Sequence, residues 1–211
     1  MNNSFIAELI ITAPPLLLAL TIHEFAHGYV AYRLGDPTAK LAGRLTLNPL
    51  HHLDPIGTIA FFLIKLGWAK PVPVNAAYFK NPRKDMLWVA LAGPMTNFSM
   101  AVISAIAIKF VWLLMEFLPS SPMVNALFVP LSAMLIASVW INLVLCIFNF
   151  LPIPPLDGSR ILTGLLPPEM ARSYEGVERY GFILILLLAF SGILSKIIFP
   201  IINFANSLLL S

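Results

Sequence analysis

Long apolar runs alternate with short polar connections along the chain. Four of these runs reach the ~20 residues that a membrane-spanning helix requires. They cover residues 5–32, 86–118, 124–150 and 180–210. The last run contains Ser191, Gly192 and Pro200, so it predicts either one long broken helix or two shorter helices. The pattern indicates an all-α polytopic membrane protein with about four to five transmembrane helices, forming a single domain over residues 1–211.

The segment between the first two runs, residues 33–85, follows a different pattern. It is rich in Gly, Pro, Asn and Thr, and short β-prone pieces alternate with turn signals. Its apolar stretch at residues 56–66 is too short to cross a bilayer comfortably. We therefore expect a re-entrant or interfacial segment here, with a fifth crossing as the alternative.

Composition supports a lipid environment. The 211 residues are 59% hydrophobic and 11% charged, whereas soluble domains have roughly 45–50% apolar and about 25% charged residues. The single cysteine, Cys146, excludes an internal disulfide and a multi-cysteine metal site. The net charge is +3, but the basic residues form no dense block. We therefore expect no nucleic-acid partner.

The basic residues predict how the chain crosses the membrane. They gather in two connections, between the first and second runs and between the third and fourth. Their members are Arg33, Lys40, Arg44, Lys65, Lys70, Lys80, Arg83 and Lys84 in the first, and Arg160, Arg172 and Arg179 in the second. By the positive-inside rule both connections face the cytoplasm. We expect a multi-pass protein of the cell membrane.

A His-Glu-x-x-His motif, "HEFAH" at residues 23–27, lies in the first apolar run. Residues i and i+4 share one helical face, so His23 and His27 can bind one zinc ion, while Glu24 can act as general base on a metal-bound water. A polar cluster that only forms hydrogen bonds is the alternative. Such a cluster is costly inside an apolar helix without a functional need. The motif therefore predicts a zinc site.

Catalytic zinc usually takes a third protein ligand, and several residues could supply it. His51 and His52 lie in a polar loop, and Glu169, Glu175 and Glu178 lie in a charged connection. Asp157 is favoured, because it follows the third run in the proline-rich "NFLPIPPLDG", where irregular backbone at membrane depth requires a protein-lined or wet cavity. The first and third runs both cross from outside to inside, so this end of the third run lies at the depth of the histidines.

These motifs together resemble the site-2 protease family of intramembrane zinc metalloproteases. The resemblance covers most of the chain. It rests on "HEFAHG", "GRLTLNPLHHLDPIGT" (43–58), "KPVPVN" (70–75), "LAGPMTN" (91–97) and "NFLPIPPLDG" (149–158). The resemblance implies that His23, His27 and Asp157 bind one Zn²⁺ and that Glu24 activates water. It also implies that Asn149 steadies the substrate or the oxyanion, whereas Asn97 is expected to be structural.

The resemblance further implies a small membrane-associated β-sheet within residues 41–80 that receives an extended substrate. The substrate-binding edge would be formed by Pro71, Val72, Pro73, Val74 and Asn75, since proline is confined to sheet edges or bulges. No inserted PDZ domain and no nucleotide-binding CBS tail is recognised, so the chain is similar to a compact form of the family.

The expected function is hydrolysis of peptide bonds within or near transmembrane segments of membrane proteins, with the active site toward the cytoplasm. The expected partners are a transmembrane protein substrate and the lipid bilayer, and the oligomeric state stays open. A zinc transporter or sensor without proteolytic activity is the alternative. An inactive relative that only binds membrane partners is disfavoured by Glu24.

Overall fold

The computed structural model describes residues 3–57 and 69–211. Four of its helices are long and apolar enough to span a membrane: α1 (Asn3–Arg33), α4 (Pro82–Phe117), α5 (Pro122–Asn149) and α9 (Ile193–Leu210). The prediction of an all-α, multi-pass membrane protein is confirmed at this level. Shorter helices, α6 (Asp157–Leu165), α7 (Pro168–Glu175) and α8 (Glu178–Phe190), lie between α5 and α9.

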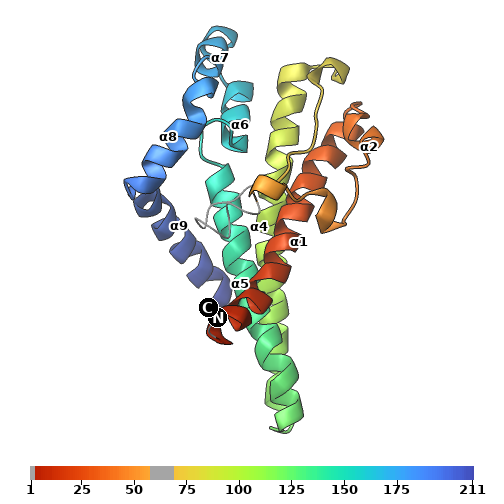
Figure 1. Cartoon of the computed structure of the whole chain (residues 1–211), viewed down its shortest axis with the longest axis vertical. Coiled ribbons are helices and arrows are strands. Elements are labelled where there is room, and N and C mark those ends of the chain that lie inside the picture. The colour runs from red at the N-terminus through yellow and green to blue at the C-terminus, as the bar shows by residue number, and fades with distance from the viewer. Residues whose placement is uncertain (1–2, 58–68) are drawn as a thin grey trace.

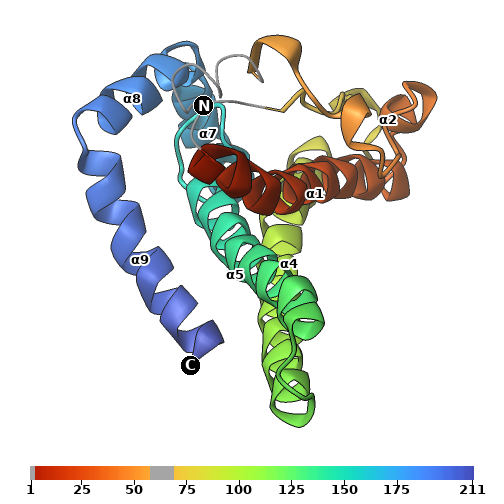
Figure 2. The same ribbon diagram turned by 60° about the horizontal axis from the view of Figure 1, so that its bottom comes forward.

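Helices α4 and α5 form an antiparallel hairpin against which α1, α6 and α9 pack (Figure 1). Asn81 caps the first turn of α4 by accepting a hydrogen bond from Lys84 N, and Ser121 does the same for Val124 N at the start of α5. Helix α1 crosses this hairpin, as Figure 2 shows, and packs against both helices.

The apolar core lies between α4, α5 and α9. Small residues on α4, Ala101 and Ala105, allow α5 and α9 to approach closely. The same buried cluster contains Val139, Leu143, Ile198 and Ile202. This cluster is thus made by three membrane-length helices, while a second buried cluster joins Ala31 of α1 to Phe79 and to Val89 of α4.

The last apolar run forms two helices rather than one. Helix α8 ends at Phe190 and α9 begins at Ile193, while Pro200 lies inside α9. Gly192 has a φ of +73°, a backbone conformation that glycine adopts at little cost. Of the two alternatives for residues 180–210, the structure has the shorter pair.

The predicted β-sheet within residues 41–80 is not supported. In its described parts, 41–57 and 69–80, the structure has an isolated antiparallel bridge between Leu53 and Ala69, but no strand. Short helical turns occur in the described parts of the connection instead, among them α2 (Thr38–Leu41), η1 (Pro49–His51) and η2 (Ala76–Tyr78). Most of the stretch expected to be re-entrant, residues 56–66, lies outside the described residues.

Side chains satisfy most of the extended backbone of residues 69–75, although Lys70 N donates to the backbone oxygen of His52. Buried Arg44 donates to the carbonyl oxygens of Lys70 (2.6 Å) and Pro71 (3.2 Å). Val72 N donates to Glu24 Oε2 at 2.8 Å. Proline has no backbone N–H, so Pro71 and Pro73 have nothing to donate to a ladder. The β-prone sequence therefore forms an extended segment that hydrogen bonds from Arg44 and to Glu24 hold in place.

Candidate metal centre

Two histidines on one face of α1 form the base of the site. His23 and His27 are both buried, and one helical turn separates them. Their Nε2 atoms lie 3.0 Å apart, and the two rings meet nearly edge to face. The spacing recognised in the sequence therefore brings two potential ligand atoms together inside the molecule.

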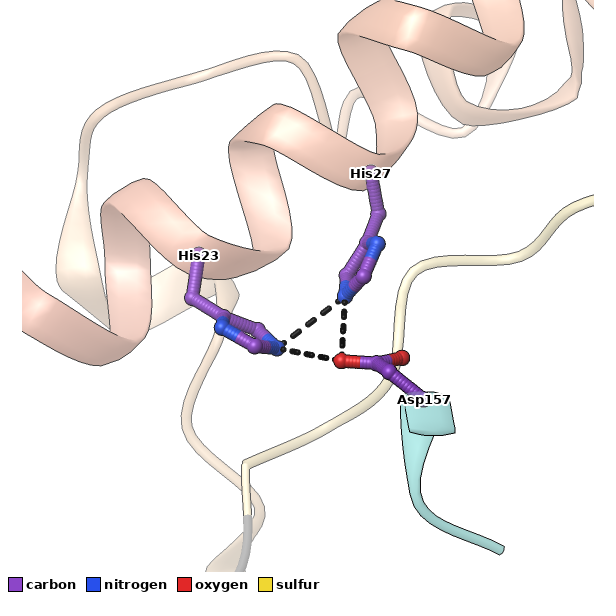
Figure 3. Close-up of side chains that lie close together, drawn as sticks. All are labelled: His23, His27 and Asp157. Carbon is purple, nitrogen blue, oxygen red and sulfur yellow. Dashed lines mark hydrogen bonds and ion pairs between the residues drawn. The ribbon is translucent and has the colours of Figure 1, made fainter. Parts of the chain in front are cut away.

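Asp157, the first residue of α6, completes a cluster of three (Figure 3). Its Oδ2 atom lies 3.2 Å from His23 Nε2 and 3.3 Å from His27 Nε2. Gly158 lies so close to the carbonyl oxygens of Phe150 and Leu151 that a side chain there would clash with them. This close approach folds the proline-rich connection back onto the end of α5 and points Asp157 at α1.

Helix α4 packs against the cluster and contacts both the histidines and α6. Gly93 lies directly against both imidazoles, since a Cβ atom built on it would be only 2.5–2.6 Å from His23 Cε1 and Nε2, and closer still to His27 Nε2. Arg83, near the start of α4, donates to Thr163 O of α6 at 2.9 Å, which ties the helix that carries Asp157 to α4.

Each imidazole is also held through its second nitrogen. His27 Nδ1 lies 2.7 Å from Val89 O, and His23 Nδ1 lies 2.5 Å from Asn97 Oδ1. A carbonyl oxygen can only accept, so His27 Nδ1 is the donor and its Nε2 keeps a free lone pair. Metal-binding histidines are commonly oriented in this way by an acceptor on the other nitrogen.

The geometry fits a zinc ion. Ligands about 2.0–2.1 Å from a tetrahedral zinc lie about 3.3 Å from one another, and the three contacts here span 3.0–3.3 Å. Asp157 Oδ2 is buried, and within the described part of the chain its polar neighbours are the two Nε2 atoms. Three protein ligands with a fourth position left for water is the arrangement of catalytic zinc.

The carboxyl group of Asp157 stays ionised in this setting. Burial alone would raise its pKa, but the neighbouring imidazoles of His23 and His27, when they are protonated, outweigh burial and hold the pKa well below the ordinary value; a cation bound in place of those protons would act in the same direction. Asp157 is therefore in the carboxylate form that binds a cation.

Glu24 follows His23 in the helix and is half-buried. Its Oε2 atom accepts the hydrogen bond from Val72 N, so the carboxylate is connected to the extended segment. Within the described residues, Oε1 has no hydrogen bond. Oε2 of Glu24 is thus held by a hydrogen bond, while Oε1 is able to accept a proton.

The structure leaves some sequence candidates outside the cluster. His52 is buried but binds Thr46 O and Arg44, and His51 is exposed. Asn149, the last residue of α5, donates to Leu145 O of its own helix. The glutamates of the second charged connection, Glu169, Glu175 and Glu178, are exposed. Of the candidates for the third ligand, the structure brings Asp157 to the histidines.

Two residues of α4 contribute more to the site than the sequence indicates. Asn97, for which the sequence suggests a structural role, contacts His23, and Gly93 contacts both histidines. Their spacing of one helical turn inside an apolar run would have placed them on one face. An asparagine within a membrane helix is itself a signal of function, but the sequence alone does not say which helix that face meets.

Membrane-length helices that bury a His-Glu-x-x-His motif beside a third candidate ligand, a carboxylate, define the class of intramembrane metallohydrolases. The family model for peptidase family M50 matches residues 123–190. A candidate zinc metalloprotease of Bacillus subtilis, YwhC, is 43% identical over 202 residues, which are 95% of this chain and 88% of that protein. The chain belongs to peptidase family M50, the site-2 protease family of zinc metalloproteases.

More distant relatives agree with this assignment. A candidate zinc metalloprotease of Mycolicibacterium smegmatis, Rip2, is 28% identical over 204 residues, covering 94% of this chain and 74% of the relative. Zinc metalloprotease MJ0392 of Methanocaldococcus jannaschii is 27% identical over 198 residues, covering 92% of this chain and 46% of the longer relative. No solved structure matches the chain significantly. The resemblance stated from the motifs is confirmed, and hydrolysis is favoured over zinc transport.

Proposed function

We propose that His23, His27 and Asp157 hold the zinc ion and that Glu24 is the general base of peptide hydrolysis. The observation that carries this proposal is the convergence of three ligand atoms within 3.3 Å of one another. They come from α1 and from α6, far apart in the sequence. The substrate would be a transmembrane segment of another membrane protein, or the residues beside it.

The chain's own residues account for the proton transfers. Bound zinc would polarise the scissile carbonyl and lower the pKa of a bound water. Glu24 would take the proton of that water on Oε1 and pass it to the leaving amine. The hydrogen bond from Val72 N holds Oε2, which restricts the rotation of the carboxylate and keeps Oε1 in a fixed direction.

Residues 71–75 and Asn149 would contact the substrate. The segment Pro71, Val72, Pro73, Val74 and Asn75 runs extended beside Glu24, and an extended substrate could lie along such backbone. Asn149 is proposed as a donor to the substrate carbonyl, because a side-chain amide stabilises a developing oxyanion. For this role its amide must leave Leu145 O, to which it donates in the structure.

We also propose that the site faces the cytoplasmic side of the cell membrane. The supporting observation is the position of the basic residues: Arg33 ends α1 one to two turns after His27, and Arg83 begins α4. Arg160 lies one turn after Asp157 on α6. The metal cluster thus lies near the basic ends of three helices.

The proposal is tested by purifying the Glu24→Gln variant, loading it with zinc, and measuring cleavage of a membrane-protein substrate in liposomes. Loss of a general base is expected to lower the rate by about 10²–10⁴-fold, with zinc still bound. Glu116→Gln, an exposed site near the far end of α4, is the matched control. Undiminished cleavage by zinc-loaded Glu24→Gln would contradict the assignment of the base.

A further inference from the structure

A chain of buried hydrogen bonds runs from His23 into the interface between α4 and α5. His23 Nδ1 contacts Asn97 Oδ1, and Asn97 Nδ2 donates to Asn142 Oδ1 at 2.8 Å. Asn142 Nδ2 donates in turn to Ser138 O at 2.9 Å. Asn97 is 0% exposed and Asn142 is 1% exposed, so water does not compete for these bonds.

The direction of every bond in this chain follows from its far end. Ser138 O is a backbone carbonyl and can only accept, so Asn142 must turn its NH₂ group toward it. Asn142 therefore presents its oxygen to Asn97, and Asn97 must turn its own NH₂ group toward Asn142. The second N–H of that group donates to Ala19 O of α1 at 3.3 Å.

The consequence reaches the ligand nitrogen of His23. Both hydrogens of the Asn97 amide are used, so its oxygen faces His23 Nδ1 and requires a proton there. The neutral ring then carries its lone pair on Nε2, which faces Asp157 and His27. A reversed Asn97 amide would present N–H to Nδ1 and favour a proton on Nε2, where it would block metal binding.

We infer that Asn142 is a positioning residue for zinc: it fixes the Asn97 amide and thereby the His23 tautomer that binds the metal. The inference rests on the proposed zinc site and adds a residue of α5 that touches neither the metal nor its ligands. His27 needs no such chain, because its Nδ1 donates to the backbone oxygen of Val89. Loss of a residue that orients a metal ligand typically weakens metal binding 10–100-fold.

The test measures zinc affinity of the full chain in detergent by competition with a chelator. Asn142→Leu removes the acceptor for Asn97 and is expected to weaken zinc binding at least about 10-fold. Asn142→Ala removes the same acceptor with a smaller side chain and replaces the leucine variant if that one does not accumulate. The matched control is Ser104→Ala, which shortens the polar network beyond Ser138 and should leave zinc affinity unchanged.

A double variant separates orientation from packing. An Asp at position 97 presents an acceptor oxygen to His23 in either orientation: when ionised it has acceptors only, and when protonated its single O–H can donate to Asn142 or Ala19. In an Asn97→Asp background, Asn142→Leu should therefore change zinc affinity by less than about threefold, a non-additive result expected of coupled residues. An equal loss in both backgrounds would mean that Asn142 only fills space, and would overturn the inference, as would unchanged affinity in Asn142→Leu alone.

Two further measurements need no change at Asn142. ¹⁵N spectra of histidine-labelled, zinc-loaded wild-type protein should show His23 with its proton on Nδ1 and its metal on Nε2; the reverse would overturn the inference. His23→Ala tests the underlying site. If that variant binds zinc as tightly as the wild type, the proposed zinc site itself fails. If it loses zinc while Asn142→Leu keeps it, the inference about Asn142 alone fails.

Discussion

His23 and His27 are held by helices, whereas Glu24 is held by an extended segment. The histidines pack against Gly93 of α4, and their Nδ1 atoms contact Asn97 and the backbone of Val89. Glu24 instead receives its hydrogen bond from Val72, in a segment without regular secondary structure. The candidate metal ligands are thus supported by packed helices, and the proposed base by a connection without regular structure.

Arg44 holds in place the extended segment that binds Glu24. It is 6% exposed and binds the carbonyl oxygens of Lys70 and Pro71, immediately before Val72. A buried guanidinium that binds backbone carbonyls fixes both the position and the direction of the segment. Metal binding and base positioning should therefore be separable: changes on the α4 side should release zinc, and changes around Arg44 should slow catalysis with zinc retained.

The largest expected effect comes from adding one methyl group on the helical side. Gly93→Ala places a Cβ atom 2.5–2.6 Å from His23 and nearer still to His27, so the ligands must move. A displacement of about 1 Å at such a site costs on the order of 100-fold. We expect zinc affinity and proteolysis to fall together by that amount, measured by chelator competition and by cleavage in liposomes.

Ser99→Ala, an exposed change on the same helix, is the control for Gly93→Ala and should behave as wild type. Normal zinc binding by Gly93→Ala would show that α4 does not support the histidines as closely as the structure indicates.

A smaller and different effect is expected from Arg44→Gln. Without the guanidinium, residues 70 and 71 lose two hydrogen bonds, and Val72 no longer holds Glu24 in one direction. We expect kcat to fall about 10-fold or more, as for a mispositioned base, while zinc content stays at one ion per chain. Lys40→Gln removes an exposed cation of the same connection and serves as the control. If Arg44→Gln lost zinc in proportion to its activity, the two sides of the site would not be separable.

The smallest effect is expected at Gly28, where the two regions meet. A Cβ atom there would lie 2.9 Å from Leu45 Cδ2, 3.0 Å from Val72 Cγ1 and 3.1 Å from Ala39 Cβ. Two of these contacts are side-chain ends that can move aside, so Gly28→Ala should lower turnover only a few-fold, with unchanged zinc affinity. Gly28→Val, which adds two more methyl groups, should enlarge the loss. Equal turnover of the wild type, Gly28→Ala and Gly28→Val would mean that the connection lies farther from α1 than in the structure.

The sequence predicts the helices and the metal cluster better than the connection between them. His23 and His27 follow from helical spacing alone, and Asp157 follows from the membrane crossing of two apolar runs. Residues 69–75 look β-prone, but most of their backbone hydrogen bonds are made with the side chains of Glu24, Asp36 and Arg44. Because these partners belong to other elements of the fold, no local sequence pattern predicts them.

For the same reason, the sequence does not predict which residues support the candidate ligands. Gly93 and Asn97 share a helical face, but their function depends on which helix that face meets. The inferred role of Asn142 acts through Asn97, which bonds to both Asn142 and His23. Tertiary packing decides such roles, and it is read from the structure.

Two imidazoles of α1 and one carboxylate of α6 are proposed to hold a single zinc ion. Zinc K-edge X-ray absorption of the purified, zinc-loaded protein tests this proposal most directly. We predict two histidine ligands with Zn–N distances of about 2.0–2.1 Å and the remaining positions filled by oxygen. Asp157→Ala should lose the metal or show altered oxygen coordination. A sulfur ligand at about 2.3 Å, or a spectrum with one imidazole or none, would contradict the account.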